Sequence, residues 1–192
     1  MALVPSSLPA IEPVSLAEAK LHLRVDHDDE DILILSLISA ARLHLEHVLG
    51  RAFITQGWLY LLDGWPSGHT LELPLSPVQS IVSVKVYDET DVAETVAPSL
   101  YLLDGLSQPP RLVRRSSSAF PRPGRSANGV EVSFVAGHGS LASEVPAPLR
   151  QALMLLVAHW YEHRQPVEIG DAKEVLPAIV TELIAPYRRR GL

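Results

Sequence analysis

Residues 28–50 read DDEDILILSLISAARLHLEHVLG, and this stretch decides the fold. The acidic residues at its start favour the positive end of a helix dipole, and Gly50 is typical of the left-handed position that ends a helix. Between them, apolar residues recur at the spacing of one helix face: Ile34, Leu37, Ile38, Ala41, Leu45, Val48 and Leu49. The pattern predicts a long helix over residues 28–49 that fills a core.

The same helix carries apolar residues outside that face. They are Ile32, Leu33, Leu35 and Leu43. More of its surface is therefore apolar than one packed face requires, and exposed apolar surface is typical of contacts between proteins. We expect Ile32, Leu35 and Leu43 to contact another subunit.

The remaining chain predicts an α+β fold, a small helical bundle with an antiparallel β-rich insertion. A capping box of Ser15 and Glu18 predicts a helix over residues 16–24, and proline punctuation frames helices at 147–163 and 178–185. Alternating β-favouring runs predict strands in a meander, at residues 53–62, 78–87 and 130–135. We expect an extended arm (1–13), a helical core (14–50 plus 146–176), the β-rich insertion (51–145) and a C-terminal docking segment (177–192).

The composition of the chain excludes several classes of protein. Of the 192 residues 47% are hydrophobic, as in globular proteins, and the absence of cysteine excludes disulfide frameworks and thiol nucleophiles. The net charge of −6 opposes bulk attraction to nucleic acid. Residues 1–13 contain no Lys or Arg, unlike a signal peptide, and no apolar run approaches the roughly 18 residues of a membrane span. We expect no membrane partner.

One segment of the insertion is strongly basic. Residues 107–128 contain no acidic residue and predict a mobile loop with five arginines: Arg111, Arg114, Arg115, Arg122 and Arg125. These side chains can contact DNA phosphates or an acidic protein groove, and a solvated mobile segment is an equally good interpretation.

Several patterns resemble metal sites. His159–His163 fits the H-x-x-E-H arrangement of a zinc hydrolase, but no third ligand is evident, and His163 suits a helix C-terminus instead. A second group contains His22, His27, His44, Glu46 and His47, for which solvated histidines are the simpler interpretation. The acids of residues 26–31 lack the order of a calcium loop and fit helix capping. We expect no metal, no cofactor and no catalysis.

An ordered series of short motifs, spread from Val14 to Arg188, resembles head-tail connector proteins of tailed phages. The similar segments are Val14–Lys20, His22–Asp26, Gly50-Arg51, Leu73-Pro74, Pro77-Val78, Val135–Gly139, Val145-Pro146, Leu149–Ala152 and His159–Arg164. The longer form with a strand-rich insertion is found in prophages of alphaproteobacteria and in their gene transfer agents. Within this family the His159–Arg164 segment is a packing motif.

The resemblance implies an adaptor, a ring of about twelve copies between the portal and the stopper or tail, through which double-stranded DNA passes. The C-terminal segment would dock into the portal through Ile179, Leu183, Ile184, Tyr187, Arg188, Arg189 and Arg190. Its short helix has little core of its own, so we expect it to order on binding. Assembly would take place in the host bacterial cytoplasm. Another neck or tail-completion protein is the alternative, and a zinc hydrolase the distant one.

Overall fold

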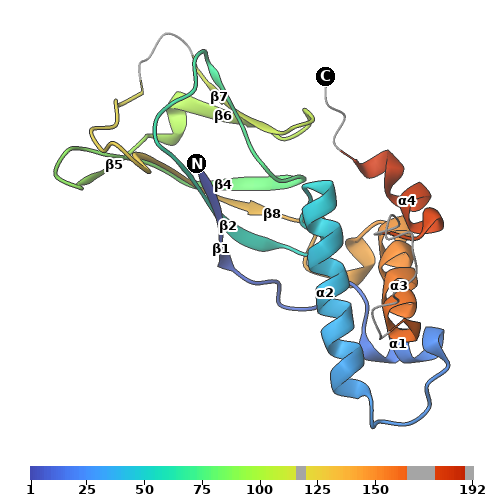
Figure 1. Cartoon of the computed structure of the whole chain (residues 1–192). Helices are drawn as coiled ribbons and strands as arrows, with labels where there is room; N and C mark the ends of the chain where they lie inside the picture. Colours follow the sequence, from blue (N-terminus) through green and yellow to red (C-terminus); the bar gives the residue numbers. More distant parts are fainter. Residues whose placement is uncertain (116–119, 164–175, 189–192) are drawn as a thin grey trace, which may run out of the picture. The chain divides into compact units, whose positions relative to one another are not determined.

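The computed structural model describes residues 1–115, 120–163 and 176–188, which form two compact units (Figure 1). Met1–Ala10 and Thr55–Gly137 form a β unit. Ile11–Ile54 and the described residues from His138 onward form a helical unit. Because helices and antiparallel sheets are segregated in this way, the predicted α+β class is confirmed.

The helical unit contains the four predicted helices, each within a few residues of its expected bounds. They are α1 (Leu16–Leu23), α2 (Asp31–Leu49), α3 (Ala147–Glu162) and α4 (Ala178–Ile184). Short 3₁₀ turns η2 (Ala142–Glu144) and η3 (Ala185–Tyr187) precede α3 and follow α4. Pro186 therefore does not end the last helix abruptly, because one 3₁₀ turn continues through Tyr187.

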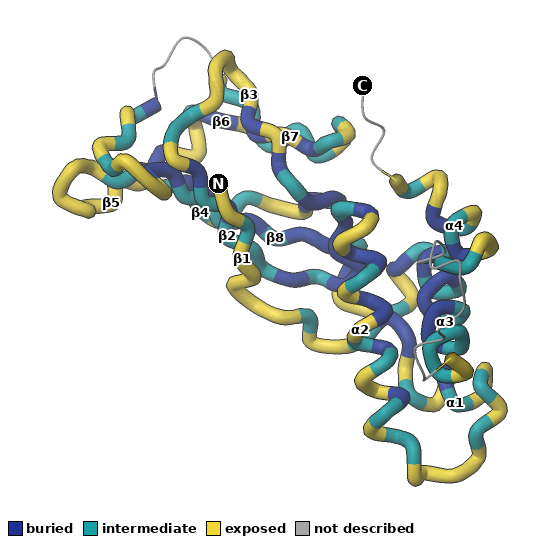
Figure 2. Tube along the Cα trace, in the orientation of Figure 1, coloured by how far each residue is buried: buried dark blue, intermediate teal, exposed yellow. Residues whose placement is uncertain are grey.

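The core of this unit lies between α2 and α3. Figure 2 shows buried positions along both helices, with exposed positions interspersed along α2. Ile34, Ile38 and Leu45 of α2 and Leu149 and Leu153 of α3 are fully buried. Each such side chain contributes about 1.5–3 kcal/mol of transfer free energy, so the predicted stripe supplies most of the drive for helix packing.

The helix ends follow local chemistry. The capping box is confirmed, because the Ser15 hydroxyl accepts from the Glu18 N–H and the Glu18 carboxylate accepts from the Ser15 N–H. Hydrogen bonds donated to the Glu18 carboxylate, from the Ser15 backbone N–H first and from the Ser15 hydroxyl next, hold the pKa of Glu18 below its ordinary value. Gly50 ends α2 with φ of 60°, in the predicted left-handed conformation.

The acidic cluster before α2 has a different role from the one predicted. Glu30 occupies the N-cap without a side-chain capping bond. Asp28 and Asp31 instead accept hydrogen bonds from the Lys20 ammonium at 2.6 and 2.7 Å. The capping prediction is therefore wrong, and these carboxylates connect α1 to the start of α2.

A buried ionic network crosses the helical unit. The Arg42 Nε donates to Glu12 Oε2 at 2.7 Å, and Arg42 Nη1 donates to Glu46 Oε2 at 2.8 Å. The other Glu46 oxygen accepts from the Phe53 N–H at 2.7 Å. Arg42 and Glu46 are buried. The network therefore connects α2 to the chain segments on both sides of it.

The β unit contains two antiparallel sheets. The larger has the order β1-β2-β8-β4-β5, formed by β1 (Ala2–Ser7), β2 (Gln56–Leu62), β4 (Val78–Tyr87), β5 (Ala93–Thr95) and β8 (Val130–Ala136). The smaller has the order β3-β7-β6, formed by β3 (Thr70–Glu72), β6 (Tyr101–Asp104) and β7 (Arg111–Arg114), with the 3₁₀ turn η1 (Pro98–Leu100) before β6.

Three predictions for this unit need correction. The strands do not form a simple meander, because β8 lies between β2 and β4 and pairs with both. The arm predicted for residues 1–13 is in part β1, an edge strand that pairs with β2. The loop predicted for residues 107–128 begins with β7, whose Arg111–Arg114 backbone pairs with β3 and β6, so this part is not a mobile loop.

Among the described helices, only α2 is long and apolar enough to cross a membrane by length and composition. Its buried face belongs to the helical core, and it carries the Arg42–Glu46 ion pair. We therefore assign α2 to the core of the unit.

The ionic network predicts a large loss of stability in Glu46→Ala. The substitution leaves the buried Phe53 N–H without its acceptor and Arg42 with one carboxylate, so the free energy of unfolding should fall by about 3–5 kcal/mol. His47→Ala, on the exposed side of the same helix, should change it by less than about 0.5 kcal/mol. Urea denaturation followed by circular dichroism measures both, and equal effects would contradict the prediction.

Candidate assembly surfaces

Three exposed apolar residues of α2 form one stripe, whereas Val48, predicted to lie on the core face, is 38% exposed on another side of the helix. Ile32, Leu35 and Leu43 have exposed fractions of 85%, 46% and 57%. At 100° per residue they lie within about 80° of one another around the helix axis. Their exposure in the monomer is as predicted, and the contact with another subunit stays a prediction. We call these three residues the α2 stripe.

The C-terminal helix does not behave as a free docking segment. Val180 and Ile184 are fully buried in the helical core, whereas Ile179 is 56% exposed. The Arg51 Nε donates to the Tyr187 carbonyl at 2.8 Å, and its guanidinium lies 5.7 Å from the centre of the Tyr187 ring. The packing of α4 in the core shared with α2 and α3 therefore corrects the expectation that this helix orders only on binding to a partner.

This packing changes which side chains can dock. Ile184 is not available to a partner because it has no exposed surface. Leu183 and Tyr187 are partly buried, while Ile179 and Arg188 are exposed. The predicted contacts of Arg189 and Arg190 lie outside the described residues.

The basic residues of the insertion are mostly engaged within the β unit. Arg111 Nε donates to Asp104 at 2.9 Å, and Arg115 Nε donates to the Tyr101 carbonyl at 3.1 Å. Hydrogen bonds from Ser107 first, and then from Arg111, hold the pKa of Asp104 below its ordinary value. These hydrogen bonds make the guanidinium groups of Arg111 and Arg115 less available to bind DNA phosphates.

Arg125 is also held in place. Its Nε lies 2.8 Å from Asp91, and its guanidinium lies 4.6 Å from the centre of the Tyr87 ring. The remaining two arginines, Arg114 and Arg122, form no ion pair within the described part of the chain, and both line a pocket of the β unit.

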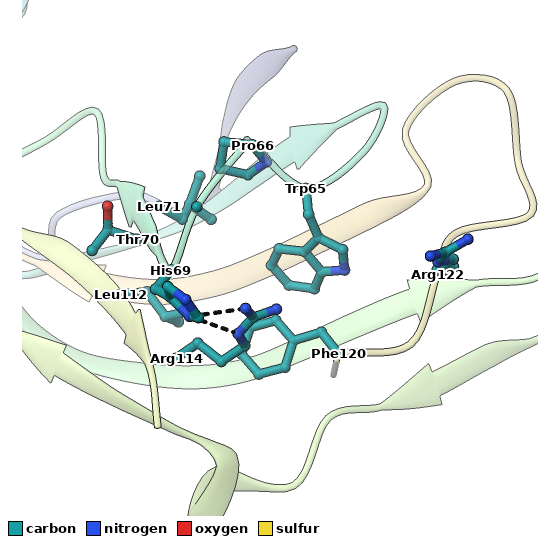
Figure 3. A pocket seen from close by; sticks show the side chains of 10 residues that line it. Trp65, Pro66, His69, Thr70, Leu71, Leu112, Arg114, Phe120 and Arg122 are labelled. Carbon is teal, nitrogen blue, oxygen red and sulfur yellow. Dashed lines mark hydrogen bonds between the residues drawn. The ribbon is translucent and has the colours of Figure 1, made fainter. Parts of the chain in front are cut away.

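That pocket has a volume of about 270 Å³, and Figure 3 shows the side chains that line it. The sequence does not predict it, because its residues come from β3, β7 and two loops. Trp65 and Phe120 contribute aromatic rings whose centres are 4.6 Å apart. Arg114 donates to the His69 Nδ1 from Nη2 at 2.8 Å. The sequence feature that could have indicated this pocket is the pair Trp65 and Pro66, which comes shortly before β3.

The metal-like patterns do not assemble a site. His159 and His163 have ring centres 4.6 Å apart, and no group of three potential ligands occurs among residues 1–115, 120–163 and 176–188. Glu46 is bound to Arg42 and the Phe53 N–H, and His44 contacts the edge of Trp160. The expectation that no metal binds stays a prediction.

Comparison with known proteins supports the connector interpretation. Residues 13–97 match the model of the family described as phage gp6-like head-tail connector protein. The predicted resemblance to head-tail connectors is confirmed. No curated protein matches the chain significantly.

Solved structures extend the similarity to the whole chain. A chain in the neck of an empty gene transfer agent (GTA) particle, computed with C6 symmetry, is 28% identical, with a TM-score of 0.83 over 100% of this chain and 97% of that chain. A chain in the virion of the native GTA particle is 26% identical with the same score and coverage. A chain in the native neck, computed with C12 symmetry, is 27% identical at 0.77, again covering 100% and 97%.

These matches support a role as a neck connector in a phage-like particle, which is a structural class of protein. They also support an oligomeric ring, because the matched necks have cyclic symmetry. The α+β architecture with a strand-rich insertion is shared over the full length.

The packing of α4 predicts unequal effects of two isoleucine substitutions. Ile184→Ala should lower the free energy of unfolding by about 2–5 kcal/mol, because it opens a cavity in the helical core. Ile179→Ala, one helix face away and exposed, should cost less than about 0.5 kcal/mol. Chemical denaturation of the purified chain tests this. If Ile184→Ala were also neutral, α4 would not belong to the fold of the free protein.

Proposed function

We propose that this chain is an adaptor subunit that forms an oligomeric ring between the portal and the stopper or tail of a phage-like particle. The observation that carries the proposal is full-length similarity to GTA neck chains, with a TM-score of 0.83. The subunit would be made in the host bacterial cytoplasm and act in the neck of the finished particle. Its role would be structural: it would bind neighbouring subunits and proteins and catalyse no reaction.

A cyclic ring sets a requirement on the subunit surface. Each copy contacts two neighbours through two different surfaces, because the interface is head-to-tail. The α2 stripe offers one of them, since three exposed apolar residues on a rigid core helix need no rearrangement to bind. We infer that these residues pack against the next copy, in a ring of about twelve.

The portal would contact the end of the chain. Ile179 and Arg188 are exposed on and beside a helix that is already folded, and Leu183 and Tyr187 are partly exposed beside them. Arg189 and Arg190 continue the sequence. A basic segment extending from a rigid helix suits an acidic crevice, and prior ordering of α4 reduces the entropy lost on binding.

DNA would pass through the ring without being held. The net charge of −6 repels phosphates, and Arg111, Arg115 and Arg125 are each engaged by neighbouring groups of the same unit. A wall built from such subunits has few free cations to retain DNA.

Charge on the α2 stripe should block ring formation. A chain with Ile32→Asp and Leu43→Asp should keep its melting temperature, because both positions are exposed, but two buried carboxylates at each interface oppose association. Particles made in a host carrying only this variant should be filled with DNA and tailless in negative-stain images. Val82→Asp, an exposed apolar position of the β unit, is the matched control. Tailed particles from the double variant would contradict the interface.

Neutralising the basic end tests portal attachment. Replacing Arg188, Arg189 and Arg190 with Gln should abolish co-purification with the portal, whereas Arg111→Gln with Arg115→Gln should not. This test is cleaner than deleting residues 186–192, because a deletion also removes Tyr187, whose carbonyl binds Arg51. Unchanged attachment would instead favour another neck or tail-completion role.

A further inference from the structure

We propose that the pocket of the β unit is a docking site for a partner protein segment that presents a carboxylate next to an apolar side chain. The site is defined by Trp65, His69, Leu112, Arg114, Phe120 and Arg122. None of these residues belongs to the α2 stripe or to residues 177–192. The proposal concerns the isolated chain and does not depend on ring formation.

The walls of the pocket fit an apolar side chain. Leu112 and Phe120 are 1% and 9% exposed, so they form a solid floor. The Trp65 Nε1–H donates to the Pro121 carbonyl at 2.9 Å, which holds the indole in place as one wall of the pocket. Phe120 lies against this ring, as Figure 3 shows. An apolar group entering this space would be removed from water on several sides.

The charge of the pocket is positive and uncompensated. No Asp or Glu lines it, and neither Arg114 nor Arg122 forms an ion pair with a described residue. Arg114 donates two hydrogen bonds to the His69 Nδ1. This nitrogen must be the acceptor, because an arginine side chain can only donate. The positive charge of Arg114 is therefore not neutralised by this contact. A guanidinium at an apolar wall favours a carboxylate, with which it forms short, charge-assisted hydrogen bonds.

The geometry favours a peptide over DNA. A single DNA strand would need an aromatic face for base stacking, and here Phe120 is 9% exposed and packs against Trp65, with ring centres 4.6 Å apart. The chain's charge of −6 also opposes DNA, whereas a short acidic segment brings few charges. A carboxylate flanked by an apolar side chain satisfies both features of the pocket at once.

The test uses the peptide acetyl-Ser-Glu-Phe-Glu-Ser-amide and its counterpart with Gln in place of both Glu. Titration into the ¹⁵N-labelled full chain should shift the indole N–H signal of Trp65 but not those of Trp58 and Trp160. The Glu peptide should bind at least about tenfold more tightly than the Gln peptide. Exchanging the peptide Phe for Gly should weaken binding as well, because the apolar wall is then unfilled.

Matched arginine variants complete the experiment. Arg122 is exposed, so Arg122→Gln should leave the fold intact and weaken the Glu peptide about tenfold, whereas Arg111→Gln, outside the pocket, should not. Equal binding of both peptides, equal effects of both variants, or no shift of Trp65 would overturn the proposal. Tighter binding of a 12-base-pair duplex DNA, with the same dependence on Arg122, would also overturn it and assign the pocket to nucleic acid. Ring formation by Arg122→Gln reports separately on the adaptor function.

Discussion

The buried network of Glu12, Arg42 and Glu46 is the constraint on which the helical unit depends. Two charges can be buried there because each is paired and hydrogen-bonded, with Glu46 also accepting the Phe53 N–H. The network holds the segment before α1 and the segment after α2 against one helix. The apolar residues of α2 that enter the core pack with those of α3.

The apolar residues of α2 divide between a buried side and an exposed side. Ile34, Ile38 and Leu45 are fully buried, whereas the residues of the α2 stripe, which lie elsewhere around the helix axis, are exposed. A protein that only needed a stable core would gain nothing from three exposed apolar residues on a rigid helix. This exposed surface is the reason that we propose the α2 stripe as a contact between subunits.

The helices could be predicted from sequence because their signals are local. The capping box at Ser15, the apolar stripe and Gly50 each act within a few residues of one another. The missed features depend on distant partners. Nothing near Pro5 indicates that residues 2–7 pair with β2, and Arg111–Arg114 becomes a strand only because β3 and β6 flank it. The packing of Ile184 and the pocket beside Trp65 are likewise set by tertiary contacts.

The arginines fall into two groups, according to whether a carboxylate of the same unit is paired with them. Arg42, Arg111 and Arg125 each pair with a carboxylate of the same unit, so their main contribution is to hold the fold. Arg114 and Arg122 have no such carboxylate among the described residues, and both line the pocket of the β unit, where we propose that a second protein supplies it. Counting arginines in the sequence cannot distinguish these groups, because the distinction is whether a carboxylate lies within hydrogen-bonding distance. The net acidic charge of the chain and the local cationic pocket are therefore compatible, because the first opposes bulk attraction to DNA and the second is confined to the site where we propose that an acidic protein segment binds.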